Sequence, residues 1–122
     1  MSADEQVRAV RPWGSWQVLE SGDGYKVKRI EVQPGHRLSY QTHSRRSEHW
    51  VVVAGTATCL LDGEVVVART GQHVVVAEGV AHRVSNDHGE LLVIVETQLG
   101  AYTEEDDIVR LEDDYDRCEA PS

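Results

Sequence analysis

The sequence predicts an all-β protein, a small antiparallel barrel or jelly roll with a short acidic C-terminal arm or helix. Three observations predict it. Short apolar runs rich in β-branched residues are separated by Gly, Pro or Asp-Gly turns every several residues. No run has a convincing helical period before residue 103, so no segment could be the crossover helix of a parallel sheet. The length of 122 residues suits one domain with one core.

The first elements are a lead-in, a strand and a turn. Residues 1–10 are predicted to be a flexible lead-in, and residues 11–20 begin as a turn and continue as an edge strand. Ser-Gly-Asp-Gly follows as a turn signal. Residues 25–33 then alternate as a strand. Either of its faces could point inward, one with Tyr25, Val27, Arg29 and Glu31, the other with Lys26, Lys28, Ile30 and Val32.

The middle of the chain predicts an extended segment, a returning strand and a hairpin. Residues 37–43 are extended, a polar turn follows, and residues 48–54 form the returning strand. Asp62-Gly63 lies between two apolar runs, 56–61 and 64–69, which is the strongest short hairpin signal.

Three further strands complete a barrel of about eight strands. They span residues 73–77, 81–86 and 91–96. The barrel is assigned to residues 11–102 and the acidic arm to residues 103–122, where Thr103 could cap a short helix.

The negative charge of the chain is concentrated in this arm. The formal net charge is -9, and residues 103–122 hold nine acidic residues against Arg110 and Arg117. The rest of the chain is near balance, with twelve acidic and ten basic residues. This distribution argues against nucleic acid as a partner, but a local pocket of Lys and Arg could still bind a phosphorylated small molecule.

The sequence also bears on the compartment. No apolar run approaches the ~20 residues that span a membrane, and the N-terminus lacks a secretory pattern. Cys59 and Cys118 are expected to be free thiols, because two such cysteines do not make a disulfide framework. We therefore expect a soluble, cytoplasmic protein with no membrane partner.

Four side chains are spaced as candidate metal ligands. Gln41 and His43 are two residues apart, so a strand places both on one face. Glu48 follows after a tight turn and faces the same way on the neighbouring strand, and His82 could arrive from an opposing strand. A lone histidine is more often a polar residue at a sheet end, but four donors in two spaced motifs favour a metal site. The mixed donor set suits zinc, iron, manganese, cobalt or nickel and does not choose among them.

The two spacings resemble the motifs of the cupins. The first cupin motif, G-x5-H-x-H-x4-E-x6-G, matches Gly35, Gln41, His43, Glu48 and Gly55, with Gln in place of the first His. The second, G-x5-P-x4-H-x3-N, matches Gly71, Ala77, His82 and Asn86, with Ala in place of Pro. The resemblance implies a cupin barrel, whereas the activity of a cupin must be argued from its site.

A narrower resemblance covers nearly the whole chain. The stretches RPWGSW, GYKVKRIEVQPGHRLS and EEDDIVRLED, together with the pattern between Gln41 and Ala57, are similar to one bacterial family. It is the C-terminal phosphomannose isomerase domain of bifunctional mannose-1-phosphate guanylyltransferase/mannose-6-phosphate isomerase. In that family Gln is usual at the first ligand position. Since these residues match only the isomerase half, we expect a free-standing isomerase-type cupin.

This resemblance implies an aldose–ketose isomerase that interconverts mannose 6-phosphate and fructose 6-phosphate through an enediol. It implies one divalent metal ion, zinc as the first choice, held by Gln41, His43, Glu48 and His82. Lys28 is a candidate proton-transfer base if its face of the strand points inward.

The phosphate also needs a cationic partner, and Arg46 lies beside the ligands. Lys26, Arg29 and Arg83 are the alternatives. A homodimer is expected as well, because cupin barrels commonly pair through edge strands.

Two alternative functions belong to other classes of protein. One is a non-catalytic module that binds a sugar phosphate or nucleotide sugar. The other is a dioxygenase-like cupin with iron, which usually needs more histidines, so Gln41 counts against it.

Overall fold

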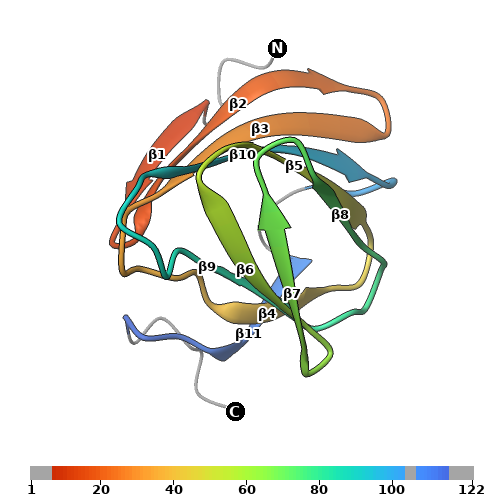
Figure 1. Cartoon of the computed structure of the whole chain (residues 1–122). Coiled ribbons are helices and arrows are strands. Elements are labelled where there is room, and N and C mark those ends of the chain that lie inside the picture. The colour runs from red at the N-terminus through yellow and green to blue at the C-terminus, as the bar shows by residue number, and fades with distance from the viewer. Residues whose placement is uncertain (1–6, 104–106, 116–122) are drawn as a thin grey trace.

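Eleven strands in two antiparallel sheets make up the computed structural model, which describes residues 7–103 and 107–115 (Figure 1). The sheets face each other around a common interior, which confirms the predicted all-β barrel. The strands are β1 (Arg8–Arg11), β2 (Gly14–Gly22), β3 (Tyr25–Val32), β4 (Tyr40–His43), β5 (Ser47–Ala54), β6 (Thr56–Leu61), β7 (Glu64–Arg69), β8 (His73–Val76), β9 (His82–Ser85), β10 (Leu92–Leu99) and β11 (Ile108–Glu112).

The chain crosses repeatedly from one sheet to the other. The six-stranded sheet has the order β1-β2-β3-β10-β5-β8, and the five-stranded sheet has the order β11-β4-β9-β6-β7. The links β4–β5, β5–β6 and β8–β9 therefore each join the two sheets. At one crossing Gly55 has φ +78°, and a Cβ there would lie 2.7 Å from the carbonyl oxygen of Leu91, so this close approach requires glycine.

The predicted hairpin is confirmed between β6 and β7. Leu61 pairs with Glu64, which leaves Asp62 and Gly63 as a two-residue loop. Both loop residues have positive φ, 46° and 84°, as a type I′ turn requires.

Both ends of the barrel differ from the prediction. Residues 8–10, assigned to a flexible lead-in, form β1 with Arg11, and β1 rather than β2 is the sheet edge. The reason is local: Ala9 is buried opposite Trp16 in the β1–β2 register.

At the other end, β11 pairs with β4 as a strand, so the barrel extends past residue 102 and the arm is extended over Ile108–Glu112. The described residues do not include 1–6, 104–106 and 116–122. Cys118, expected to be a free thiol, therefore lies outside them.

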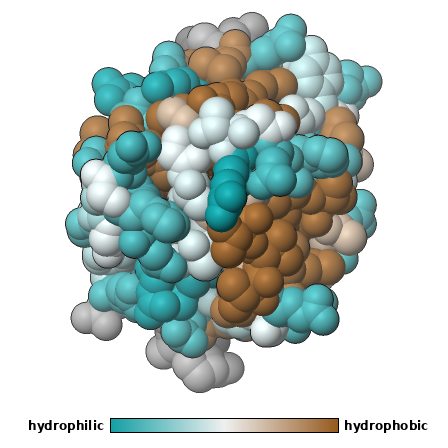
Figure 2. Space-filling view, in the orientation of Figure 1, coloured by the Kyte–Doolittle hydropathy of each residue, from teal (hydrophilic) through white to brown (hydrophobic). Residues whose placement is uncertain are grey.

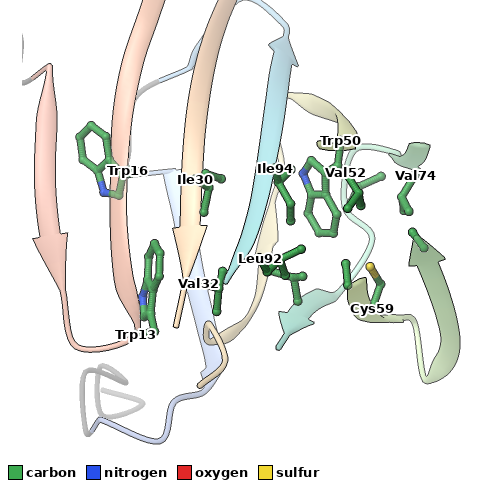
Figure 3. Close-up of a cluster of buried hydrophobic side chains, with 14 of the residues drawn as sticks. Trp13, Trp16, Ile30, Val32, Trp50, Val52, Cys59, Val74, Leu92 and Ile94 are labelled. Carbon is green, nitrogen blue, oxygen red and sulfur yellow. The ribbon is translucent and has the colours of Figure 1, made fainter. Parts of the chain in front are cut away.

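The interior side chains form rows that run across three neighbouring strands, β3, β10 and β5. Val32 pairs with Leu92, and in the next row Ile30, Ile94 and Val52 lie side by side. With Trp13 and Cys59 these residues belong to one buried apolar cluster (Figure 3). The inward face of β3 is therefore the one that carries Lys26, Lys28, Ile30 and Val32, which settles the question that alternation left open.

The outer surface carries an apolar area on the side where β7 lies (Figure 2). Exposed valines belong to the edge strand β7 and to β5 and β8 in the other sheet, namely Val51, Val53, Val65, Val66, Val67 and Val75.

The homodimer expected from the sequence stays a prediction. The described residues contain no helix with the length and hydropathy of a membrane span.

Candidate metal centre

The metal-ligand candidates converge from both sheets. His43 ends β4 and His82 begins β9, and these strands are neighbours in the five-stranded sheet. Glu48 lies on β5 in the opposite sheet. The expected placements are thus exchanged: His82 comes from a strand next to that of His43, and Glu48 comes from across the barrel. The cause is the β4–β5 link, which crosses between the sheets instead of forming a hairpin.

The group formed by His43, Glu48 and His82 could hold a metal ion. One ligand atom of each residue lies within 4.8 Å of the others, and all three side chains are buried. Nδ1 of His43 is 3.2 Å from Glu48 Oε2, and Nε2 of His82 is 3.9 Å from Glu48 Oε1. Two imidazoles and one carboxylate form a donor set typical of divalent transition metals.

His82 shows most directly that the site fits a cation. Its Nδ1 lies 2.9 Å from the carbonyl oxygen of Val80, so Nδ1 carries the proton and donates it. Nε2 is then an unprotonated acceptor, and it is buried without a hydrogen-bond partner in the part of the chain that the structure describes. A buried nitrogen lone pair directed toward a carboxylate is unfavourable without a cation between them. A backbone carbonyl that fixes the histidine tautomer is also the usual outer partner of a metal-binding histidine.

Both imidazoles are held in the neutral form that binds metals. Burial and, next in size, the nearby charge of Arg46 together lower the pKa of His43 to about 3. Burial also lowers the pKa of His82. Arg46 Nη2 lies 2.9 Å from His43 Nε2, and since arginine only donates, this nitrogen accepts and Nδ1 carries the proton toward Glu48. Metal binding by His43 would replace one of these two contacts.

Two side-chain donors orient the carboxyl group of Glu48. Arg46 Nε donates to its Oε2 at 2.9 Å, and Trp50 Nε1 donates to its Oε1 at 3.0 Å. Such charge-assisted and indole hydrogen bonds fix the orientation of the carboxylate in the barrel interior. Trp50 also packs edge-on against His82, with ring centroids 5.6 Å apart.

Gln41, the fourth predicted ligand, lies next to the group. It is the register partner of His82 between β4 and β9. Its side-chain oxygen accepts a hydrogen bond from Ser39 Oγ at 3.1 Å. The structure therefore brings all four predicted positions together, and the assignment of Gln41 as a ligand stays a prediction.

A cavity opens beside this group. Its volume, including the open mouth, is about 590 Å³. A smaller hollow of about 290 Å³, lined by Glu48 and His82, shares five lining residues with it. The polar lining of the large cavity near the metal-ligand candidates consists of Lys28, Gln41, Arg46, Glu48, Glu96 and Gln98.

Two buried groups of opposite charge face each other in this cavity. Lys28 on β3 and Glu96 on β10 are register partners, and both are about 5% exposed or less. Burial lowers the pKa of Lys28 to about 8, against the opposing effect of the Glu96 charge. Burial and the charge of Glu48 raise the pKa of Glu96 to about 7. Buried groups whose pKa values approach neutrality are characteristic of sites that transfer protons.

Lys28 was predicted from the sequence, but Glu96 was not. The predicted strand 91–96 ends at this residue, whereas β10 continues to Leu99. The available signal was the alternation itself, since Glu96 and Gln98 continue the inward face of Leu92 and Ile94. Gln98 Nε2 donates to Glu96 Oε1 at 2.6 Å, so the two polar residues form one buried unit.

The arginines proposed as partners of a phosphate group do not all lie at the cavity. Arg46 lines the cavity, and besides Glu48 and His43 it donates to the carbonyl oxygen of Thr103. Arg29 lies on the outward face of β3 and pairs with Glu31. Arg83 donates to the carbonyl oxygen of Leu38 and to Glu112 instead.

The fold and the site together define a cupin. The chain superposes on the cupin domain of Cnp3 from Schizosaccharomyces pombe with a TM-score of 0.69 and 10% identity, over 79% of this chain and 66% of that one. It superposes on Bacillus subtilis oxalate decarboxylase, described with Mn(II) centres, with a TM-score of 0.74 and 20% identity, over 87% of this chain and 30% of that one.

The sequence specifies the family within this fold. Residues 2–113 match the model of the family described as mannose-6-phosphate isomerase C-terminal, and the chain belongs to that family. The resemblance inferred from its motifs is thereby confirmed.

Its relatives are much longer proteins. The chain is 45% identical over 107 residues to the mannose-1-phosphate guanylyltransferase ManC of Salmonella typhimurium, covering 88% of this chain and 22% of the relative. It is 43% identical over 112 residues to the alginate biosynthesis protein AlgA of Pseudomonas aeruginosa, covering 92% and 23%. The chain thus spans less than a quarter of the length of these relatives.

Proposed function

We propose that this chain is a metal-dependent aldose–ketose isomerase that interconverts mannose 6-phosphate and fructose 6-phosphate. The observation that carries the proposal is that Glu48 of the metal-ligand group lines one cavity with Lys28 and Glu96. The His43–Glu48–His82 group could hold a cation, and the Lys28–Glu96 pair could move a proton beside it. The family to which the chain belongs supports the choice of substrate.

The reaction needs a group that takes a proton from one carbon and returns it to the next. In the forward direction the proton leaves carbon 2 of the aldose and is delivered to carbon 1, while a hydroxyl proton moves from the oxygen of carbon 2 to that of carbon 1. No oxidant or reductant is consumed. We infer that Lys28 and Glu96 supply the base and the acid between them, because they face each other in the cavity and both can change protonation near neutral pH.

The metal-ligand group would add electrostatic stabilisation. His43, Glu48 and His82, with Gln41 as the fourth ligand, would hold a divalent ion, which would supply Lewis-acid stabilisation of negative charge on the sugar oxygens. We propose zinc first, with cobalt, manganese, nickel and iron as alternatives, since the donor set accepts each of them. Arg46 would hold Glu48 and His43 in place through its hydrogen bonds to both.

A coupled assay tests the isomerase directly. The chain is loaded with each of the five metals, supplied with mannose 6-phosphate, and assayed for fructose 6-phosphate. We expect turnover that His82→Ala abolishes and that His73→Ala leaves unchanged, because His73 is exposed on β8. A folded, metal-binding protein with no turnover for any metal would overturn the isomerase assignment.

A second experiment assigns the proton-transfer groups. Glu96→Gln and Lys28→Met are compared for turnover and for exchange of the carbon 2 proton of mannose 6-phosphate with deuterated water. Loss of the base is expected to lower turnover by roughly 100- to 10,000-fold and to abolish exchange. If both variants keep the parental exchange rate, the proton is moved by neither residue.

A further inference from the structure

A phosphorylated sugar needs a cationic partner, and the structure narrows the choice. Of the four cations named from the sequence, Arg46 alone lines the large cavity. Its guanidinium is already directed at Glu48, His43 and the carbonyl oxygen of Thr103. The position of Arg46 therefore suits holding the metal-ligand candidates better than binding a substrate phosphate.

Arg11 is a cation of the cavity lining that the metal group does not use. It ends β1, in the part of the chain where the sequence suggested only a lead-in and a turn. Its side chain is partly exposed, and its Nη1 donates to the carbonyl oxygen of Val10 at 3.1 Å. No acidic side chain pairs with it among the described residues.

Trp16 holds this cation in place. The guanidinium carbon of Arg11 lies 5.7 Å from the centroid of the Trp16 ring, within the range of a cation–π contact. Nζ of Lys28 lies 4.3 Å from the same centroid. Two positive side chains gathered on one indole ring repel each other, and an anion between or beside them relieves this repulsion.

The charges of the side chains that line the cavity also favour binding of an anion. Four cationic side chains, Arg11, Lys28, Arg46 and Arg110, line the cavity against two carboxylates, Glu48 and Glu96. The chain as a whole carries a net charge of -9, so this excess of positive charge is local. A cavity walled by positive charge attracts anionic ligands.

We propose that Arg11, held against Trp16, forms an anion subsite that takes the phosphate group of a phosphorylated sugar and selects it over the unphosphorylated sugar. The subsite rests on the proposed function for the identity of the sugar. Arg11 lines the same cavity as Gln41 and Glu48, so one ligand can contact the subsite and this edge of the metal-ligand group. The planar guanidinium matches two phosphate oxygens at once, which an ammonium group does not.

Equilibrium binding to the zinc-loaded 122-residue chain tests the subsite. Mannose 6-phosphate, mannose and inorganic phosphate are each titrated by calorimetry into the parent, Arg11→Gln and Arg11→Lys. We expect Arg11→Gln to bind mannose 6-phosphate roughly 10- to 100-fold more weakly and mannose equally well. Arg11→Lys should fall between, because it keeps the charge but not the paired hydrogen bonds.

Arg69→Gln is the matched control. Arg69 is an exposed arginine at the end of β7, away from the cavity lining, so its loss should not change any of the three affinities. If Arg11→Gln does not fold, Arg11→Met replaces it, since methionine keeps an apolar stem against Trp16. Unchanged phosphate-ligand affinity in the folded variants, or an equal loss for mannose, would overturn the subsite.

The result separates the subsite from the isomerase. Phosphate binding that depends on Arg11, without turnover, supports the subsite and overturns the isomerase. Turnover with a KM for mannose 6-phosphate that Arg11→Gln does not change supports the isomerase and overturns the subsite.

Discussion

The two ends of strands β3, β10 and β5 use the same alternation for opposite purposes. At one end the inward rows are apolar, with Ile30, Ile94 and Val52 side by side. Two residues further along each strand, the inward row holds Lys28, Glu96 and Trp50. The row after that holds Lys26, Gln98 and Glu48.

The difference teaches which end stabilises the fold. Burying apolar side chains is favourable in proportion to the area removed from water. Burying charged groups is costly, and even well-paired buried ions are often no more stabilising than apolar residues of similar size. The apolar rows therefore provide the stability, whereas the polar rows reduce it.

Ile94→Ala removes part of an apolar row and should have the largest effect on stability of the changes considered. Ile94 is 1% exposed between Ile30 and Val52, so the change leaves a cavity and should lower the free energy of unfolding by about 2–5 kcal/mol. Denaturant unfolding of the metal-free protein measures this. Val53→Ala, on the exposed face of β5, should change it by less than about 0.5 kcal/mol. Equal effects of the two changes would contradict the assignment of stability to the apolar rows.

His82→Leu changes the polar end of the barrel interior and should affect zinc binding rather than stability. If His82 is a ligand as proposed, its loss should weaken zinc binding by more than about 100-fold, the upper end of the loss seen for outer partners of metal ligands. The metal-free variant should be as stable as the parent or more stable, because an unpartnered buried nitrogen is replaced by an apolar side chain. Zinc titration with a chelator competitor and denaturant unfolding give the two values. A destabilisation comparable to that of Ile94→Ala would show that His82 contributes to the core rather than to a metal site.

Glu96→Gln sharpens the comparison through its pH dependence. Since the pKa of Glu96 is raised from its usual 4.5 to about 7, the folded protein holds a proton there between these pH values that the unfolded chain has lost. Glu96 therefore makes the free energy of unfolding fall as pH rises through this window, by at most about 1.4 kcal/mol per pH unit. His43, with its pKa lowered to about 3, acts in the opposite direction between pH 3 and 6.5.

The variant removes the titration of Glu96 itself, which is the largest change expected in this pH window. Relative to the parent, Glu96→Gln should therefore gain stability steadily from pH 4.5 to 7 in the metal-free protein. Denaturant unfolding of both proteins at each pH gives this difference. A difference that does not depend on pH would mean that Glu96 has no raised pKa in the folded state.

The same contrast explains what the sequence could and could not predict. Strand alternation and the Asp62-Gly63 turn are local signals, and they located β3 and the β6–β7 hairpin. The motif spacing located His43, Glu48 and His82 as one group, although not the sheets from which they come. Crossings between sheets depend on contacts distant in the sequence, which spacing does not contain.

The polar rows and the terminal strands were harder to predict from the sequence, for a physical reason. Alternation does not distinguish an inward lysine from an outward one, so the burial of Lys28 needed the packing of β3 between β2 and β10. The strand β1 has one small inward residue, Ala9, and no apolar run. The acidic context of β11 resembles a solvated arm, and its pairing with β4 is supported by partners more than sixty residues away, such as Arg37 for Asp114.

The exposed polar contacts next to β11 give the smallest predicted effect. Arg37 binds Asp114 through two hydrogen bonds, at 2.6 and 2.8 Å, but both side chains are about 40% exposed. A double-mutant cycle with Arg37→Ala and Asp114→Ala should give a coupling energy of about 0.2–1 kcal/mol, and 1 M salt should remove most of it. A larger coupling that salt leaves unchanged would place this pair with the buried polar rows. The expected small value instead means that polar groups bind strongly in this barrel only where burial removes water from them.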